Sequence, residues 1–194
     1  MSSNQLAPLS SLVGAADKIK DQTRADLGGL TGIQLNWKPA PDQWSVAQCL
    51  DHLVTTNAAY FSTFDEVLAG EKVGTVWESL PFLPGLWGKM LIKGVAPEAK
   101  RKLKAPAIFH PSSSSVDESI VNRFVDQQAQ VVGYMNATAG LEPEKIIISS
   151  PVTKFVTYSL MDAYRIIINH EQRHLLQAKR VTETNGFPQA VAKL

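Results

Sequence analysis

The sequence of 194 residues has very little cysteine, almost no net charge and no long apolar run. Its single cysteine, Cys49, excludes an internal disulfide and the cysteine-rich frameworks of structural zinc sites. A lone thiol also fits a reducing compartment best. The formal charge of +1 offers no concentrated positive surface for phosphate backbones, so we expect no nucleic-acid partner.

Targeting and membrane-spanning segments are also missing from the sequence. Residues 1–11 lack the positive charge and the apolar block of a signal peptide. The most apolar stretch, residues 80–95, is interrupted by prolines, glycines and lysines and is too short to span a bilayer. We therefore predict a cytoplasmic protein. Hydrophobic residues at 44% and charged residues at 19% are ordinary globular values, and the length fits one domain over residues 1–194.

Two amphipathic helices are predicted in the first third of the chain. Residues 5–27 place apolar side chains at three-four spacing before a Gly-Gly stop. The second helix is predicted over residues 45–70. It opens at Ser45, whose spacing to Gln48 is that of a capping box. A proline-containing linker separates the two helices.

Two further helices are predicted in the second half. The third repeats the capping signal with Ser115 and Glu118 and extends to Gly140. The fourth covers residues 159–184 and has apolar residues on one face and charged residues opposite. Four such segments predict an all-α fold, a four-helix bundle.

A long insertion separates the second and third helices. Residues 71–114 are too many for a simple connection, so we predict a long irregular segment that shapes or covers something. We interpret its basic run, residues 100–104, as a solvated face. Residues 86–93 have the content of an interfacial helix, but packing over the bundle or into a dimer interface is the simpler interpretation, and membrane binding is not expected. We predict a short extended segment over residues 145–148, before the last helix.

Three of the four histidines lie on inward helix faces. His170 and His174 are four residues apart, which places their Cβ atoms about 5–6 Å from each other and lets both imidazoles reach one ion. They share their face with Ile166 and Ile167, where an unliganded imidazole is costly. His52 holds a comparable position in the second helix. The pattern predicts one divalent metal ion bound by His52, His170 and His174.

Several alternatives remain open at this stage. The three histidines could be core residues hydrogen-bonded to backbone. Cys49, one turn before His52, could close the site as a fourth ligand, although a lone cysteine in a helix is more often small core filler. His110 precedes Pro111 in the insertion and suits a surface or loop-packing role.

No general base stands out in the sequence. Asp51 and Glu171 adjoin ligands, but helix neighbours point about a hundred degrees apart, so we expect both to be solvated or in ion pairs elsewhere. Gln177, one turn beyond the last histidine, could hydrogen-bond a ligand imidazole. Tyr60 and Tyr164 could line a pocket, but core packing is the favoured role for each.

Two stretches resemble the signatures of a known family, the DinB-like superfamily. Residues 37–53 read WKPAPDQWSVAQCLDHL, in which a Trp-Ser cap precedes a helix with a histidine followed by leucine. Residues 158–177 read YSLMDAYRIIINHEQRHLLQ, a helix bearing His-x-x-x-His. The two signatures lie at the expected positions, and the resemblance covers nearly the whole chain.

This resemblance implies a four-helix bundle with an up-down-down-up path and a metal site open at one end. Carried over by position, the ligands are His52, His170 and His174, and the ion is nickel, zinc, iron or manganese. Relatives in the family include bacillithiol-dependent transferases and mycothiol-dependent isomerases. The insertion over residues 71–114 departs from the commoner pattern of the family, so the resemblance does not identify a substrate.

The function expected from these features is metal-dependent catalysis on a small-molecule substrate. Three neutral imidazoles leave the ion its full charge and an open position, which suits a hydrolase or a thiol S-transferase that uses a low-molecular-weight thiol. The alternatives are a non-catalytic metal-binding bundle and a protein that binds a partner or a membrane surface through its insertion. A homodimer is compatible with the sequence.

Overall fold

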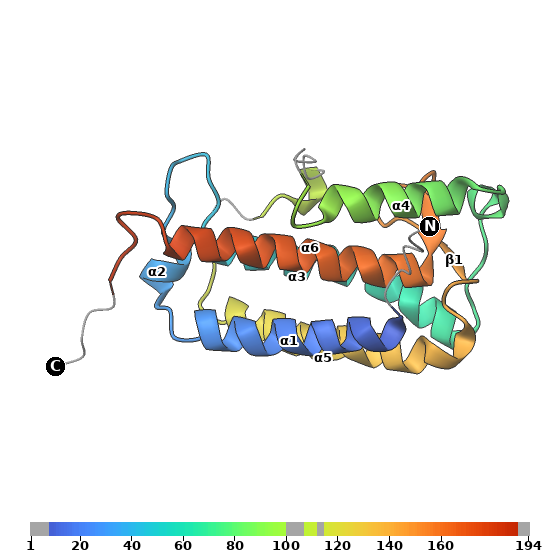
Figure 1. Cartoon of the computed structure of the whole chain (residues 1–194), viewed down its shortest axis with the longest axis horizontal. Coiled ribbons are helices and arrows are strands. Elements are labelled where there is room, and N and C mark those ends of the chain that lie inside the picture. Colours follow the sequence, from blue (N-terminus) through green and yellow to red (C-terminus); the bar gives the residue numbers. More distant parts are fainter. Residues whose placement is uncertain (1–7, 100–106, 112–114, 190–194) are drawn as a thin grey trace, which may run out of the picture.

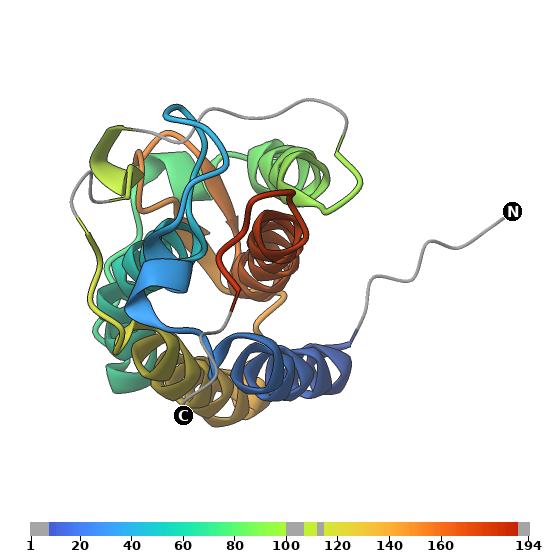
Figure 2. The same ribbon diagram turned by 90° about the vertical axis from the view of Figure 1, so that its left-hand side faces the viewer.

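Four long helices form the body of the protein (Figure 1). The computed structural model describes residues 8–99, 107–111 and 115–189. The long helices are α1 (Leu9–Leu27), α3 (Val46–Ala69), α5 (Ile120–Thr138) and α6 (Leu160–Thr182). α1 and α3 each pack against both α5 and α6. α1 and α3 therefore occupy opposite corners of the bundle (Figure 2). The predicted helical bundle is therefore confirmed, with a small hairpin added.

The α3 helix begins as the capping box predicts. Ser45 is the N-cap: its Oγ accepts a hydrogen bond from Gln48 N at 3.1 Å, and its own N–H donates to Gln48 Oε1 at 3.2 Å. At the other end, Gly70 adopts the left-handed conformation with φ of 69° that ends many helices. The predicted range, from Ser45 to about Gly70, is confirmed: these two residues are the caps of α3.

The equivalent prediction for α5 is wrong. The helix begins at Ile120 after Ser119, and Ser115 makes no cap. Asn36 of the short helix α2 (Gly32–Asn36) holds Val116 instead: its Oδ1 accepts from Val116 N at 2.8 Å, and its Nδ2 donates to Val116 O at 2.9 Å. Glu118 accepts from the N–H of Gly32 at 2.7 Å. These long-range bonds keep the chain extended where the local pattern favours a helix.

The insertion is more regular than predicted. It contains a 13-residue helix, α4 (Leu83–Val95), which lies outside the bundle against α6 (Figure 2). The prolines of this stretch do not prevent a helix here, because Pro84 falls in its first turn, where the missing N–H costs nothing. Close approach to α6 is possible because Gly88 faces Asp162, and a Cβ on this glycine would lie only 3.0 Å from the Asp162 Cγ. The predicted basic run at 100–104 and the predicted start of the first helix at 5–7 lie outside the described residues.

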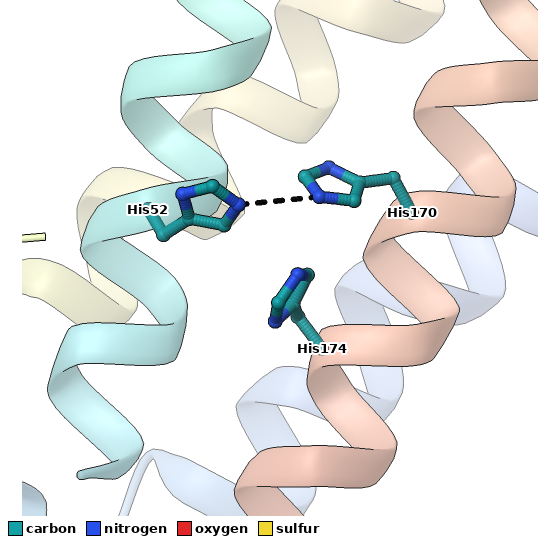
Figure 3. Close-up of side chains that lie close together, drawn as sticks. All are labelled: His52, His170 and His174. Carbon is teal, nitrogen blue, oxygen red and sulfur yellow. Dashed lines mark hydrogen bonds between the residues drawn. The ribbon is translucent and has the colours of Figure 1, made fainter. Parts of the chain in front are cut away.

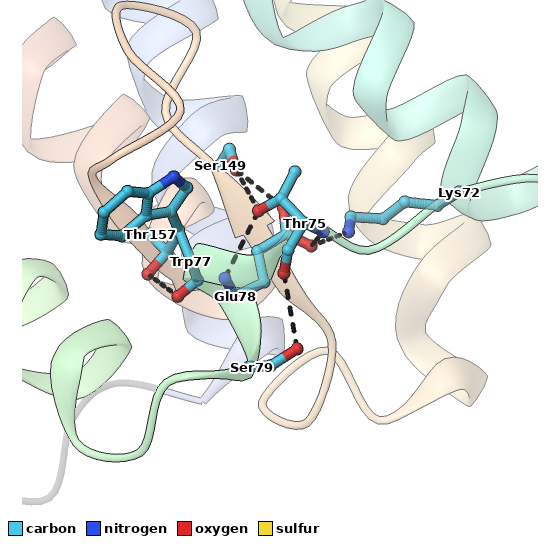
Figure 4. A network of polar contacts seen from close by, with 7 residues as sticks. All are labelled: Lys72, Thr75, Trp77, Glu78, Ser79, Ser149 and Thr157. Atoms are coloured by element: carbon cyan, nitrogen blue, oxygen red, sulfur yellow. Dashed lines mark hydrogen bonds and ion pairs between the residues drawn. The ribbon is translucent and has the colours of Figure 1, made fainter.

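A two-stranded hairpin anchors the path from α3 to α4. β1 (Ile147–Ser149) pairs antiparallel with β2 (Thr157–Ser159), which leads directly into α6, so the predicted extended piece is present. The 3-10 turn η1 (Val76–Ser79) docks here through Glu78 (Figure 4). Glu78 accepts hydrogen bonds from Ser149 Oγ at 2.8 Å and from Lys72 Nζ at 2.6 Å. The start of the insertion is thus fixed to the body of the protein.

In the described part of the chain, no helix combines the length and the apolar character that a membrane crossing requires.

Candidate metal centre

The three predicted histidines converge between α3 and α6. His52 projects from α3 toward His170 on α6, and His174 lies one turn along α6 from His170 (Figure 3). One ring nitrogen from each histidine lies within 4.8 Å of the others. The Nε2 atoms of His52 and His170 are 3.2 Å apart. The i, i+4 spacing on α6 and the packing of α3 against α6 therefore bring all three imidazoles to one point.

The insertion orients one of these rings. His52 Nδ1 donates a hydrogen bond to the backbone oxygen of Phe109 at 2.6 Å, within the 3-10 turn η2 (Ala107–Phe109). Because a neutral imidazole carries one proton, this bond leaves the lone pair on Nε2, the nitrogen that faces His170. A backbone oxygen on the far nitrogen is the usual partner of a metal-binding histidine. η2 therefore sets the tautomer and the ring orientation that a ligand needs.

Trp44 forms one wall of the site. Its ring stacks on His174 with centroids 5.5 Å apart and planes at 20°, and it contacts His52 at 5.0 Å. Trp44 directly precedes Ser45, so the same cap that starts α3 places this indole over the histidines. A large apolar ring against two imidazoles limits the water that reaches them.

Burial keeps the three imidazoles neutral. It is the main cause that lowers the pKa of His52, His170 and His174, and all causes together bring the pKa of His174 down to about 3. For His170 and His174, repulsion by the neighbouring histidines when these are protonated, and by Arg173, is part of that lowering. A neutral imidazole is the form that binds a metal ion. The cluster is therefore in its ligand state at neutral pH.

The donor set fits a divalent metal ion. Nitrogen ligands of a tetrahedral ion at about 2.0–2.1 Å are about 3.3 Å from each other, close to the 3.2 Å between the two Nε2 atoms. Nδ1 of His174 is buried without a hydrogen-bond partner among the described residues. An unpartnered buried imidazole nitrogen is costly unless something binds it. These residues could hold the ion, and no other His, Cys, Asp or Glu of the described chain joins their cluster.

Cys49 and His110 are not among the candidate ligands, but His110 directly follows Phe109, and its charge adds to the effect of burial in lowering the pKa of His52. Cys49 is fully buried, and burial raises the pKa of its thiol to about 12, which opposes the thiolate form that binds metal. It lies outside the cluster of candidate ligands, in keeping with its interpretation as core filler. His110 is exposed, as a surface role predicts.

The expectation for Glu171 is wrong. Its side chain is fully buried, where Oε1 accepts hydrogen bonds from Asn57 Nδ2 at 2.7 Å and from Gln128 Nε2 at 2.6 Å. Burial raises the pKa of Glu171 to about 7. The i, i+1 argument places this residue off the histidine face correctly, but that direction leads into the interface with α3 and α5 instead of into solvent. Asp51 is half-buried.

The remaining polar candidates have modest roles. Gln177 is half-buried and favours the protonated form of His174, but Nδ1 of that ring has no partner at hydrogen-bond geometry, so we do not assign Gln177 as its anchor. Tyr60 bonds Tyr158 through the two hydroxyls at 2.9 Å, and Tyr164 bonds Thr138 at 2.9 Å. Both candidate tyrosines are buried, so core packing is their role.

Two contributors to the centre were missed by sequence reasoning. Trp44 could have been predicted from the sequence, because it directly precedes the capping box at Ser45, which starts the helix that carries His52. Phe109 could not have been predicted, because the contact comes from its backbone oxygen, 57 positions from His52, and is independent of its side chain.

Comparison with known proteins places the chain among relatives of one kind. The family model described as the DinB superfamily matches residues 15–178. The protein YuaE of Bacillus subtilis (strain 168) is 25% identical over 162 residues, which is 84% of this chain and 91% of YuaE. YfiT from Bacillus subtilis shares the fold with a TM-score of 0.58 and 13% identity, over 97% of this chain and 94% of that chain. Its structure is described as that of "a probable metal-dependent hydrolase with an unusual four-helix bundle topology".

Proposed function

This chain belongs to the DinB superfamily, as its two signatures predict, and from that premise we propose that it is a metal-dependent hydrolase. The ligands in this proposal are His52, His170 and His174. The observation that carries it is the convergence of three neutral imidazoles, two of them with Nε2 atoms 3.2 Å apart, at a point that contains no further protein ligand from the described residues. A three-ligand site leaves coordination positions for water and substrate, as catalytic metal sites do.

The chain itself supplies placement and shielding. A divalent ion in this position acts as a Lewis acid and lowers the pKa of a bound water or thiol toward neutrality. The Phe109 carbonyl holds His52 in the tautomer that presents Nε2. Trp44 covers His174 and limits access of water from its side. Arg173 places a positive charge near His170 and His174 and donates hydrogen bonds to Gly94 O and Ala96 O at the end of α4.

Hydrolysis is favoured over thiol transfer by the description of YfiT, whose fold this chain shares. Thiol S-transfer stays a prediction from the sequence. If a thiol takes part, it must come from outside the chain, because Cys49 is buried with a pKa raised to about 12. The identity of the ion, among nickel, zinc, iron and manganese, belongs to the same prediction.

We propose the up-down-down-up path as well. The colour gradients of Figure 1 support it, because α1 and α6 run one way and α3 and α5 the other. A single domain, a small-molecule substrate, a cytoplasmic location and a homodimer stay predictions.

The test is hydrolysis that depends on metal and on all three histidines. We expect the protein, stripped with chelator and reloaded with each of the four metals, to hydrolyse members of a panel of chromogenic carboxylic esters, amides and phosphate esters. His52→Ala should lose at least about a hundredfold in kcat/KM, the size reported for losing groups that stabilise transition-state charge. His110→Ala, which removes the exposed histidine, is the matched control and should keep full activity.

Two results would count against the proposal. One is turnover that survives both chelation and His52→Ala. The other is no turnover in the panel but metal-dependent consumption of an added low-molecular-weight thiol with an electrophile, which would favour the S-transferase instead.

A further inference from the structure

The outer face of α4 is apolar and open to solvent. Leu86 and Met90 are four residues apart and share one face of the helix, and Phe82 is the N-cap residue directly before it. The exposed fractions of Phe82, Leu86 and Met90 are 91%, 63% and 50%, whereas Pro84 and Gly88 on the inner side are buried against the protein. The helix therefore has an apolar face left over after it has packed on α6.

Two further aromatic side chains are exposed in segments close to the start of this helix. Trp77 of η1 and Phe155 of the loop between β1 and β2 meet edge to face, with centroids 4.9 Å apart, and both are exposed. Figure 1 shows the start of α4 at the same end of the bundle as the hairpin, and α4 packs against β2. Figure 4 shows Trp77 at one end of the network that fixes η1, where its backbone oxygen accepts a hydrogen bond from Thr157. We call Trp77, Phe82, Leu86, Met90 and Phe155 the apolar cap.

Lysines are the charged side chains within the segments of the apolar cap. Residues 79–97 and 150–160 contain Lys89, Lys93 and Lys154, all exposed, and no aspartate or glutamate. Of the acidic residues that border the first segment, Glu78 is half-buried and bonded to Lys72, and Glu98 is exposed. The surface thus combines exposed aromatic and aliphatic side chains with three lysines.

We propose that the apolar cap is a docking surface for an anionic lipid bilayer. Exposed aromatic and aliphatic side chains flanked by lysines are the composition of helices that lie in the membrane interface. Anionic headgroups attract such lysines, while Phe82 and Leu86 enter the acyl boundary. The helix lies on the membrane and does not cross it, which agrees with its 13 residues.

A second copy of the chain fits this surface less well. A two-fold symmetric dimer places the same patch of both subunits face to face. Lys89, Lys93 and Lys154 of both subunits would then enter one interface without an acidic partner in these segments, and like charges across an interface are unfavourable. An anionic surface removes this conflict, because it supplies the missing negative charge.

Sedimentation with phosphatidylcholine vesicles, with and without phosphatidylglycerol, tests the proposal at low ionic strength. We expect the protein to bind the anionic vesicles and to be released by added salt. The variant F82S/L86S should bind at least roughly tenfold more weakly than the wild type, because two apolar anchors are lost. K89Q/K93Q should lose about 25-fold, since each lysine near an anionic surface contributes about fivefold. Ile33→Ser, at a residue of α2 that is 77% exposed, is the matched control and should bind like the wild type.

Three outcomes would overturn the proposal. These are a wild type that does not bind anionic vesicles, equal binding by F82S/L86S, and a dimer in light scattering that F82S/L86S abolishes. All four proteins keep the three histidines, so their metal content and hydrolytic activity report separately on the proposed function.

Discussion

His52 shows how a single backbone contact can decide the chemistry of a side chain. Its Nδ1 is bonded to the Phe109 oxygen, and only for that reason is Nε2 the nitrogen that faces His170. The histidines themselves could be predicted from the sequence because the i, i+4 spacing and the inward face are local patterns. The Phe109 contact could not, because it depends on where a distant segment of the insertion folds back.

A buried carboxylate is a second feature of the residue scale. Glu171 accepts two hydrogen bonds from Asn57 and Gln128 in the interior. We predict that Glu171→Ala lowers the free energy of unfolding by about 3 kcal/mol, because it leaves two buried amide donors without an acceptor. Glu171→Gln, which keeps one carbonyl acceptor, should lose less. Urea unfolding of the metal-free proteins measures both, and equal losses would contradict the role of the carboxylate as acceptor.

Buried tyrosines make the stability depend on alkaline pH. Burial raises the pKa of Tyr158 and of Tyr164 to about 12, above the value of about 10 in an unfolded chain. Between these values the folded protein keeps protons that the unfolded chain has lost, so the contribution of the two tyrosines to the free energy of unfolding is constant below pH about 10 and falls as pH rises further. The expected slope is about 1.4 kcal/mol per pH unit for each group.

The variant Tyr164→Phe isolates one of these groups. Its unfolding free energy should decline less steeply above pH about 10 than that of the wild type. At neutral pH it should lose only about 1 kcal/mol, the value of the hydrogen bond to Thr138. Urea unfolding at a series of pH values provides the comparison, and identical alkaline slopes would show that Tyr164 titrates alike in both states.

At the scale of elements, capping interactions and close contacts between helices determine where the helices begin, end and pack. α3 could be predicted to its caps because Ser45, Gln48 and Gly70 act on their own neighbours. The start of α5 could not, because Asn36 holds Val116 extended from a site 80 positions away. The same holds for α4, whose position depends on a helix that lies far along the chain.

Two serines with the same local signal provide a comparison of caps. Ser45→Ala should destabilise the protein by about 1 kcal/mol, because the N–H of Gln48 loses its side-chain acceptor. Ser115→Ala should change the free energy of unfolding by less than about 0.5 kcal/mol, because Ser115 is exposed and caps nothing. Thermal or urea unfolding distinguishes them. A loss at Ser115 as large as at Ser45 would mean that α5 begins where the pattern predicts.

Two glycines of α4 test how this helix is seated. Gly88→Ala should lower the free energy of unfolding by about 1–3 kcal/mol, because the new Cβ meets Asp162 of α6. Gly85→Ala adds the same methyl group where no atom lies within 4 Å, and it should stabilise the helix by about 0.5–1 kcal/mol. Urea unfolding reads out both, and a similar response at the two positions would contradict the packing of α4 on α6.

At the scale of the whole molecule, the bundle brings together residues that the sequence keeps apart. His52 and His170 are separated by 118 positions, and they meet because α3 packs against α6. Periodicity predicts that each helix has an inward face, so the meeting of inward histidines could be predicted. Which surfaces stay uncovered could not, because the apolar cap becomes visible only once α4 has used its other face for packing.

The metal content of the protein tests the central claim most directly. Elemental analysis of protein purified without an affinity tag should find one divalent ion per chain in the wild type and in His110→Ala. His174→Ala should retain its helical circular dichroism and lose the ion, because two imidazoles remain where three bind. A wild type without stoichiometric metal, or a His174→Ala protein with the metal content of the wild type, would contradict the assignment of His52, His170 and His174 as ligands.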